Sequence, residues 1–439
     1  MSTKKKKRRK KSRKGLSSKE LRQLAILGII VLVVIVAVAA VFILTGGTQL
    51  FQKNAKIEPP AAIETNPTQE TSETVPETTV DPMWLKGDAA VEHALESMSL
   101  EQKIYQLFIV TPEVLVDNVV SCVVQTGPTT KEALSEKPVG GVIFFAQNLE
   151  NADQTTDMIT GMQSCMRANE YQGLWIAVDE EGGSVTRVAK QLDTTKYDTM
   201  ESYGKAGDAE AVRKVGEGIA KDISKFGFNL DFAPVADVNI NSQNELGDRI
   251  FSSDPQTVST MVGAMVEGLQ SSGEVSATLK HFPGLGAESG NTHEDKQTHI
   301  DRSLDQLRNT EFVAFQGGLD AGADFVLVGH QIVSAAGDGL PSSMSPVVIN
   351  DWLRGELGFQ GVVITDSHQM NTIAGTYGSG EAAVKTLQAG GDIILMPADL
   401  GDAYQGVYEA VQNGTLTEER IDESVRRILT AKEKHGLLY

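Results

Sequence analysis

The chain has 439 residues and a formal net charge of −19, and this length allows one large domain with accessory segments. Twelve of its 39 Lys and Arg but one of its 58 Asp and Glu lie before residue 23, so the remainder carries 27 basic and 57 acidic residues. Its two cysteines, Cys122 and Cys165, permit one disulfide, which a domain of this size does not require, and two buried free thiols are an equal alternative.

The N-terminal part consists of a basic tail at residues 1–23 and an apolar segment at 24–45. Leu24 to Leu44 are 21 uncharged residues, about 31 Å of helix and enough to cross a bilayer core. Basic flanks stay in the cytoplasm, so the pattern predicts a retained, single-pass signal anchor, with the membrane as a partner and the rest of the chain extracytoplasmic. A cleaved signal peptide is the alternative, but the apolar run exceeds its usual length. Beside a membrane span, the basic run favours anionic lipid over nucleic acid as its partner.

Residues 46–82 are rich in Thr, Glu and Pro and contain almost no large apolar side chains. Such a segment cannot bury a core, so it is predicted to be a disordered tether.

Residues 83–439 contain short apolar runs separated by stretches of helical length. Eight such runs are expected to be strands: Gln106 to Val110, Gly141 to Phe145, Trp175 to Val178, Leu230 to Pro234, Ser276 to Leu279, Phe325 to Val328, Val362 to Thr365 and Ile393 to Met396. The alternation predicts an α/β fold, a single (β/α)8 TIM-like barrel, with an open doubly wound sheet as the alternative.

Helix signals support this alternation. Ser99 to Gln102 is a capping-box pattern. Thr417 is expected to cap a final helix that ends before Gly436 and has Ile421, Val425, Ile428 and Leu429 along one face.

Ionisable residues follow five of the expected strands. They are Asp179, Asp237, Lys280 with His281, His330 and Asp366. Because barrel enzymes keep their sites at the C-terminal ends of the strands, these residues should meet around one mouth.

The chemistry of these residue types points to glycoside cleavage. Asp366 at a rigid strand end suits an anionic nucleophile for an oxocarbenium-like centre, although a helix N-cap is the ordinary role of such an aspartate. His293 lies in a loop with three glycines, and a histidine can donate and recover a proton near neutral pH. A solvated loop histidine is its ordinary alternative.

Two further stretches suit a polar ligand. Asp179 to Arg187 and Gly247 to Phe251 supply aspartates that accept sugar hydroxyls and arginines that donate to them, with a turn cap and a surface ion pair as the alternatives. Gly284, Gly286 and Gly290 miss the dinucleotide-binding spacing, and Gln297 stands where a zinc motif needs a second histidine. We therefore expect no cofactor and no metal.

Seven blocks of the chain resemble, in order, glycoside hydrolase family 3, specifically its β-N-acetylhexosaminidase branch. They are Met98 to Phe108, Val139 to Phe145, Asp179 to Arg187, Asn229 to Val238, Gly247 to Pro255, Lys280 to Gly284 with His293, and Ile421 to Leu437. The resemblance implies a barrel that hydrolyses terminal β-linked N-acetylglucosamine with retention of configuration. It implies Asp366 as nucleophile and His293 as acid/base, with substrate-binding positions at Asp179, Arg187, Arg249, Lys280 and His281.

Three positions depart from the pattern of that branch. Asn291 stands where an aspartate usually orients the histidine, Leu285 where a second loop histidine is common, and Ser367-His368 where acidic and apolar residues usually follow the nucleophile. Glu288 or Asp295 is expected to substitute for the missing carboxylate, and otherwise the rate should suffer. The sequence thus predicts a membrane-anchored, extracytoplasmic β-N-acetylhexosaminidase acting on cell-wall (peptidoglycan) or chitin-type fragments. The alternatives are a catalytically weak carbohydrate-binding barrel and another retaining β-glycosidase.

Overall fold

The computed structural model describes residues 86–117, 121–287 and 297–439. The basic tail, the apolar segment at 24–45, the whole tether at 46–82 and His293 with its neighbours lie outside these residues. No helix within the described ranges is long and apolar enough to cross a membrane. The predicted anchor at residues 24–45 lies outside these ranges.

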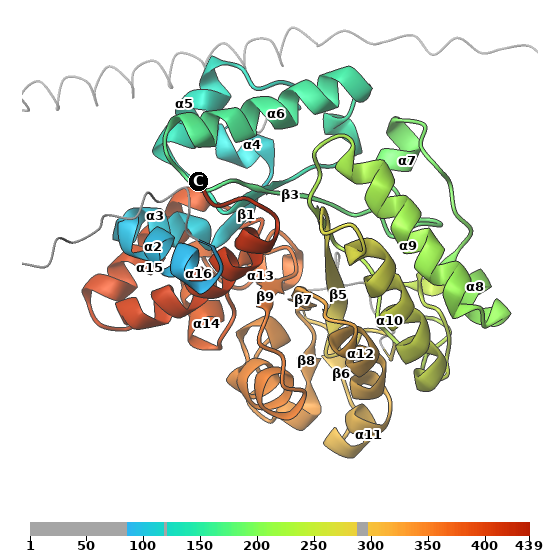
Figure 1. Ribbon diagram of the computed structural model, residues 1–439. Coiled ribbons are helices and arrows are strands. Elements are labelled where there is room, and N and C mark those ends of the chain that lie inside the picture. The colour runs from blue at the N-terminus through green and yellow to red at the C-terminus, as the bar shows by residue number, and fades with distance from the viewer. Residues whose placement is uncertain (1–85, 118–120, 288–296) are drawn as a thin grey trace, which may run out of the picture. The chain divides into compact units, whose positions relative to one another are not determined.

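Eight parallel strands form one sheet in the order β10-β1-β2-β3-β4-β5-β7-β9. Figure 1 labels β1, β3, β5, β7 and β9 of this sheet. They are β1 (Phe108–Val110), β2 (Gly141–Ile143), β3 (Trp175–Val178), β4 (Leu230–Asp231), β5 (Ser276–Phe282), β7 (Phe325–Val328), β9 (Val362–Thr365) and β10 (Ile394–Leu395). A parallel bridge between Ile364 and Ile393 brings β9 against β10. The sheet is therefore a nearly closed barrel, and each of the eight apolar runs overlaps one of its strands.

The strands were recognisable because both of their faces are covered. Every residue of β3, β5, β7 and β9 is buried, and strands of a parallel sheet between helices read as continuous apolar runs. The prediction was wrong at one end: β5 continues beyond Leu279 to Phe282 and therefore includes Lys280 and His281. Its pairing with β7 is irregular between Leu279 and Phe282, and the side chains of Lys280 and His281 line the pocket described below.

Helices follow the strands and cover the barrel (Figure 1). Those described are α2 (Asp88–Ser97), α3 (Leu100–Gln106), α4 (Pro112–Leu115), α5 (Pro128–Glu136), α6 (Ala152–Ala168), α7 (Val188–Gln191), α8 (Met200–Ala206), α9 (Ala209–Ser224), α10 (Pro255–Gln270), α11 (Leu304–Asn309), α12 (Glu311–Asp320), the π-helix η6 (Val347–Glu356), α13 (Asn371–Ala374), α14 (Ser379–Gln388), α15 (Leu400–Gln412) and α16 (Glu418–Lys434). The two helix predictions are confirmed. Ser99 and Gln102 form the capping box of α3, and Thr417 caps α16, whose predicted apolar face is buried.

A second, small sheet lies at the rim of the barrel. In it β6 (His299–Ile300) pairs with β8 (Ile332–Val333), which follows β7. The backbone N–H of Ile332 donates to the carbonyl of Thr298 at 2.7 Å. This sheet holds His299 and Ile300, which lie shortly after residue 297, where the description of the chain resumes. It places them next to the segment that follows β7.

Candidate active site

A pocket of about 490 Å³ opens at the C-terminal ends of the barrel strands. Six of the seven predicted site residues line it: Asp179, Arg187, Arg249, Lys280, His281 and Asp366. The seventh, His293, lies outside the described residues. The structure thus brings together side chains that are as much as 187 positions apart in the sequence, and their catalytic and binding roles stay predictions.

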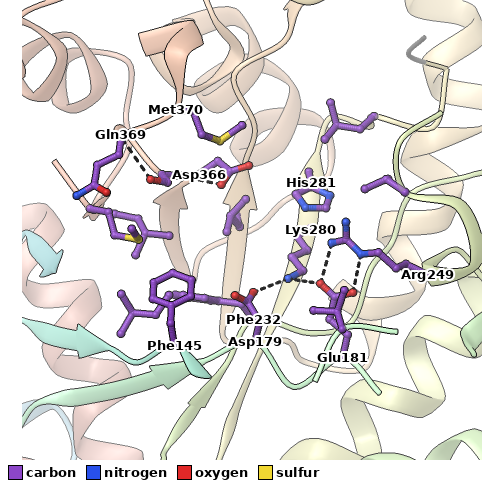
Figure 2. Close-up of a pocket in the computed structure, with 18 of the residues that line it drawn as sticks. Phe145, Asp179, Glu181, Phe232, Arg249, Lys280, His281, Asp366, Gln369 and Met370 are labelled. Carbon is purple, nitrogen blue, oxygen red and sulfur yellow. Dashed lines mark hydrogen bonds and ion pairs between the residues drawn. The ribbon is translucent and has the colours of Figure 1, made fainter. Parts of the chain in front are cut away.

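Lys280 lies between two carboxylates on one side of the pocket (Figure 2). Its Nζ is 2.6 Å from Glu181 Oε1 and 2.9 Å from Asp179 Oδ1. Glu181 also accepts a two-pronged contact from Arg249, whose Nε and Nη2 lie 2.8 and 2.7 Å from its two oxygens. Arg249 is therefore part of a largely buried network and is not in a surface ion pair, which was the alternative interpretation.

The charges of this network stabilise one another. Burial alone would raise the pKa of Glu181, but the nearby Lys280 and Arg249 outweigh it and lower that pKa to about 2. Burial would likewise lower the pKa of Lys280, yet Asp179 and Glu181 raise it above its ordinary value. Glu181 and Lys280 therefore stay charged near neutral pH, so the pocket presents a fixed ionic acceptor and a fixed ionic donor.

His281 is held by Asp237, which is fully buried in the segment that follows β4. Asp237 Oδ2 lies 2.8 Å from His281 Nδ1 and accepts from the backbone N–H of the same residue at 3.1 Å. The backbone N–H of Leu285 donates to Oδ1 at 2.5 Å. Because the carboxylate makes Nδ1 the donor, Nε2 is the ring nitrogen left for a ligand.

Asp366 follows β9 and is half-buried in the pocket wall. Its Oδ1 accepts from the backbone N–H of Ser367 at 2.7 Å. Burial would raise the pKa of Asp366, but His281, His330, the Ser367 amide and Lys280 together lower it. The next helix, α13, begins only at Asn371 with Met370 as its N-cap residue. Asp366 is therefore an anion that is not used as a helix cap.

Leu285, one of the three departures, has a structural role. It packs with Val235, Leu246 and Ile250 in a small buried cluster. Leu246 and Ile250 flank the short helical turn Gly247–Arg249 that carries Arg249. Leu285 thus helps to fix Arg249 in the network. A histidine, which is common at this position in the related branch, would place a polar ring in this apolar cluster.

Sequence reasoning missed the part that Glu181 plays. Glu181 lies two residues after Asp179, and an extended chain places such residues on the same side. This spacing, together with the cations Lys280 and Arg249 expected at the same barrel mouth, could have indicated that Glu181 belongs to the site. Its neighbour Glu180 faces elsewhere, where its carboxylate accepts from the backbone N–H groups of Arg187, Val188 and Ala189 at the start of α7.

His330 and His368 lie behind Asp366, with ring centroids 5.5 Å apart. His330 Nε2 is 3.0 Å from the carbonyl oxygen of Ser367, and its Nδ1 is 2.8 Å from Ser343 Oγ. His368 is buried, does not line the pocket and has no hydrogen-bond partner for its ring nitrogens within the described ranges. Burial and the nearby His330 place the pKa of His368 well below its ordinary value, which makes it a poor proton donor.

The arrangement suits a small polyhydroxylated ligand. Carboxylates accept hydroxyl protons and the ammonium and guanidinium groups donate to oxygen, while an anionic Asp366 is available for covalent attack. Phe145 and Phe232 supply apolar surface to the same pocket. Within the part of the chain described, no three His, Cys, Asp or Glu side chains are grouped to hold a metal ion.

Comparisons with known proteins agree with this chemistry. A β-hexosaminidase A of Pseudoalteromonas piscicida is 32% identical over 70% of this chain, which spans 55% of that relative's length. A β-hexosaminidase of Nitrosomonas eutropha is 32% identical over 70% of this chain and 88% of its own. The solved structure of a family 3 β-N-acetylglucosaminidase from Paenibacillus superposes with a TM-score of 0.73 at 32% identity, covering 78% of this chain and 63% of the other.

The match to a family model extends through the barrel, from residue 99 in the capping box of α3 to residue 431 in α16. The family is described as the glycosyl hydrolase family 3 N-terminal domain. With a match of this length and the site built as above, the chain belongs to glycoside hydrolase family 3.

Proposed function

We propose that the chain is a retaining β-N-acetylhexosaminidase that releases terminal β-linked N-acetylglucosamine. The observation that carries the proposal is the anionic Asp366 in one pocket with the ion network of Asp179, Glu181, Lys280 and Arg249. Relatives named β-hexosaminidase, with up to 36% identity, support the sugar specificity.

In this mechanism Asp366 attacks the anomeric carbon while the bond to the leaving oxygen breaks. His293 gives its proton to that oxygen, so the leaving group departs as a neutral alcohol. The resulting glycosyl ester is cleaved by water, which His293 deprotonates in turn, and the two inversions give overall retention. Asp179, Lys280, His281 and the two arginines hold the sugar during both steps, and the role of His293 rests on the sequence alone.

A panel of chromogenic glycosides tests the proposal on the purified full chain. We expect the nitrophenyl β-N-acetylglucosaminide to be cleaved with the highest kcat/KM, ahead of the β-glucoside and β-xyloside, and NMR to show the β-anomer as the first product. A preference for the β-glucoside would favour another retaining β-glycosidase. Binding of N-acetylglucosamine without hydrolysis would favour a carbohydrate-binding barrel, an alternative raised by Asn291.

We also propose that residues 24–45 anchor the chain in the cell membrane, with the N-terminus cytoplasmic and the barrel outside. The apolar run and its basic flank support this topology. A tether of about 35 residues reaches on the order of 30 Å by random-coil scaling, which suits cleavage of cell-wall or chitin-type fragments near the membrane. Protease added to intact cells should remove the barrel and leave the first 45 or so residues with the cell. Full protection of the barrel would contradict the topology.

A further inference from the structure

A buried carboxyl group lies next to the ion network of the pocket and takes no part in the mechanism above. It belongs to Asp231, the second residue of β4, which is fully buried and does not line the pocket. In the register of the sheet, Asp231 pairs with Val178 of β3 on one side and with Ala277 of β5 on the other. Asp179 directly follows β3 and Lys280 belongs to β5. Asp231 therefore lies between the two strands that supply this ion pair.

The two oxygens of Asp231 have different surroundings. Oδ1 accepts from the backbone N–H of Glu180 at 2.9 Å. Oδ2 is buried and has no hydrogen-bond partner within the described ranges. The ammonium group of Lys280 is directed to Glu181 and Asp179 instead, at 2.6 and 2.9 Å. A buried hydroxyl without a partner costs much less free energy than a buried charge without one, so these contacts favour a neutral carboxyl group with Oδ2 as its hydroxyl.

The charged groups that face Asp231 act in the same direction. Burial raises the pKa of Asp231 well above its ordinary value of 3.8, and the neighbouring Glu180 and Asp179 raise it further. The Glu180 amide and the Lys280 ammonium group lower this pKa, but they do not outweigh the burial. Surroundings of this kind can keep a carboxylic acid neutral near neutral pH.

The hydrogen bond from Glu180 connects Asp231 to the sugar-binding side chains. Glu180 stands between Asp179 and Glu181, so its N–H fixes the chain where it leaves β3. The carboxylate of Glu180 accepts from the backbone N–H of Arg187 at 2.7 Å. The segment from Asp179 to Arg187 is thus held near both ends, at its start by the carboxyl group of Asp231 and at its end by that of Glu180.

We infer that Asp231 is a positioning residue for sugar binding, which holds the Asp179–Arg187 segment in place as a neutral carboxylic acid. The inference rests on the proposed function. A carboxylate at this position would compete with the carboxylates of the segment for the ammonium group of Lys280. Because Asp231 does not line the pocket, a change at this position should alter KM and the affinity for the sugar and leave kcat nearly unchanged.

Two substitutions separate the hydrogen bond of Asp231 from its charge. Asp231→Asn keeps an oxygen that accepts from the Glu180 N–H but cannot ionise, and Asp231→Leu has a similar shape without the acceptor. Asp324→Asn is the matched control, because Asp324 is also buried but precedes β7 at the other end of the barrel, where it binds Lys434 at 2.6 Å. For each full chain, kcat and KM for nitrophenyl β-N-acetylglucosaminide and the inhibition constant of N-acetylglucosamine are measured at neutral pH.

We expect Asp231→Asn to keep KM and the inhibition constant within about threefold of the natural values, and Asp231→Leu to raise both about tenfold or more at nearly constant kcat. Asp324→Asn should lower the unfolding midpoint and leave KM unchanged. A KM in Asp231→Asn as high as in Asp231→Leu would show that the negative charge is required, and this would overturn the inference. An unchanged KM in Asp231→Leu would overturn it as well.

Infrared difference spectra between the natural chain and Asp231→Asn test the neutral state directly, even if Asp231→Leu does not fold. We expect the C=O stretch of a protonated carboxyl group in the natural chain at neutral pH and its absence in Asp231→Asn. Carboxylate bands in its place would overturn the inference.

Urea unfolding tests the same proton through stability. A carboxyl group whose pKa is raised by folding stabilises the fold below its unfolded pKa, and this stabilisation is lost as the pH rises. Asp231→Asn should therefore gain in unfolding midpoint over the natural chain from about pH 4 to about pH 7. A constant difference would contradict the neutral state. A natural chain that hydrolyses no glycoside would contradict the proposed function instead, and the calorimetric affinity for N-acetylglucosamine would then replace KM in the same comparison.

Discussion

Glu181 Oε1 lies 2.6 Å from Lys280 Nζ, in a pair whose side chains are almost wholly buried. Because Glu181 also binds Arg249 through two contacts, one carboxylate contacts two cations at the mouth of the barrel, and Asp179 supplies the second negative charge. The network fixes Lys280 and Arg249 before any ligand arrives, which lowers the ordering cost of binding.

Glu181→Gln should therefore destabilise the fold as well as weaken substrate binding. The substitution keeps the size of the side chain but leaves two buried cations with Asp179 alone. Removal of one partner from a buried ion pair costs about 3–5 kcal/mol, and urea unfolding should show a loss of that order. Glu356→Gln, which breaks the more exposed pair with Arg308, is the matched control and should change the unfolding midpoint far less. Equal effects of the two substitutions would show that the network is unimportant for stability.

The same carboxylate should make stability depend on pH in the acid range. The pKa of Glu181 is about 2 in the folded chain against an ordinary value of 4.5. A group whose pKa is lowered by folding stabilises the fold above its unfolded pKa, and this stabilisation is lost as the pH falls from about 4.5 towards 2. The loss is on the order of 3 kcal/mol. Chemical unfolding between pH 6 and 3 should therefore show a shallower decline for Glu181→Gln than for the natural chain. Parallel curves would contradict this linkage.

Asp366→Asn should abolish hydrolysis while the melting temperature and the affinity for N-acetylglucosamine stay nearly the same. The amide oxygen can still accept from the Ser367 N–H, which now binds Asp366 Oδ1, so only the anion is lost. Loss of a nucleophile normally costs several orders of magnitude in kcat. Asp248→Asn is a suitable control, since Asp248 binds Ser184 outside the pocket. Retention of more than about a tenth of kcat in Asp366→Asn would point to another nucleophile.

The barrel could be predicted from the sequence because its buried parallel strands are short apolar runs, and a charged residue directly follows some of them. Val362 to Thr365 is a continuous apolar run and Asp366 is the first charged residue after it, so both the strand and the position of the carboxylate were readable. The partners of the charged residues were not readable in this way. Arg249 and Glu181 are 68 positions apart, and their pairing depends on how a long segment after β4 folds back over the rim.

His330 should position the loop that carries Asp366. Burial lowers the pKa of His330, so the ring stays neutral, with Nε2–H donating to the Ser367 carbonyl and Nδ1 accepting from Ser343. His330→Ala should lower kcat by about 10–100-fold through misplacement of Asp366, with KM changed much less. Ser343→Ala removes only the hydrogen bond to His330 Nδ1, which favours the Nε2–H tautomer. It should therefore lower kcat less than His330→Ala does. A lower melting temperature with unchanged kcat in His330→Ala would show a purely structural role.

The last prediction concerns His293, whose role rests on the sequence. If His293 protonates the leaving oxygen, His293→Ala should slow hydrolysis of a disaccharide far more than that of an activated aryl glycoside, which departs without protonation. General acid catalysis contributes on the order of 10²–10⁴-fold, and that is the expected difference between the two substrates.

Asn291→Asp should act in the opposite direction on the same reaction. An aspartate near the imidazole orients it and favours its protonated form, so the substitution should raise kcat for the disaccharide. It should have little effect on the aryl glycoside, and it should have none on either substrate in a chain that also carries His293→Ala. Equal losses for both substrates in His293→Ala would mean that this histidine only positions the sugar. Because His368 is buried and does not line the pocket, the search for the proton donor would then turn to Glu288 and Asp295.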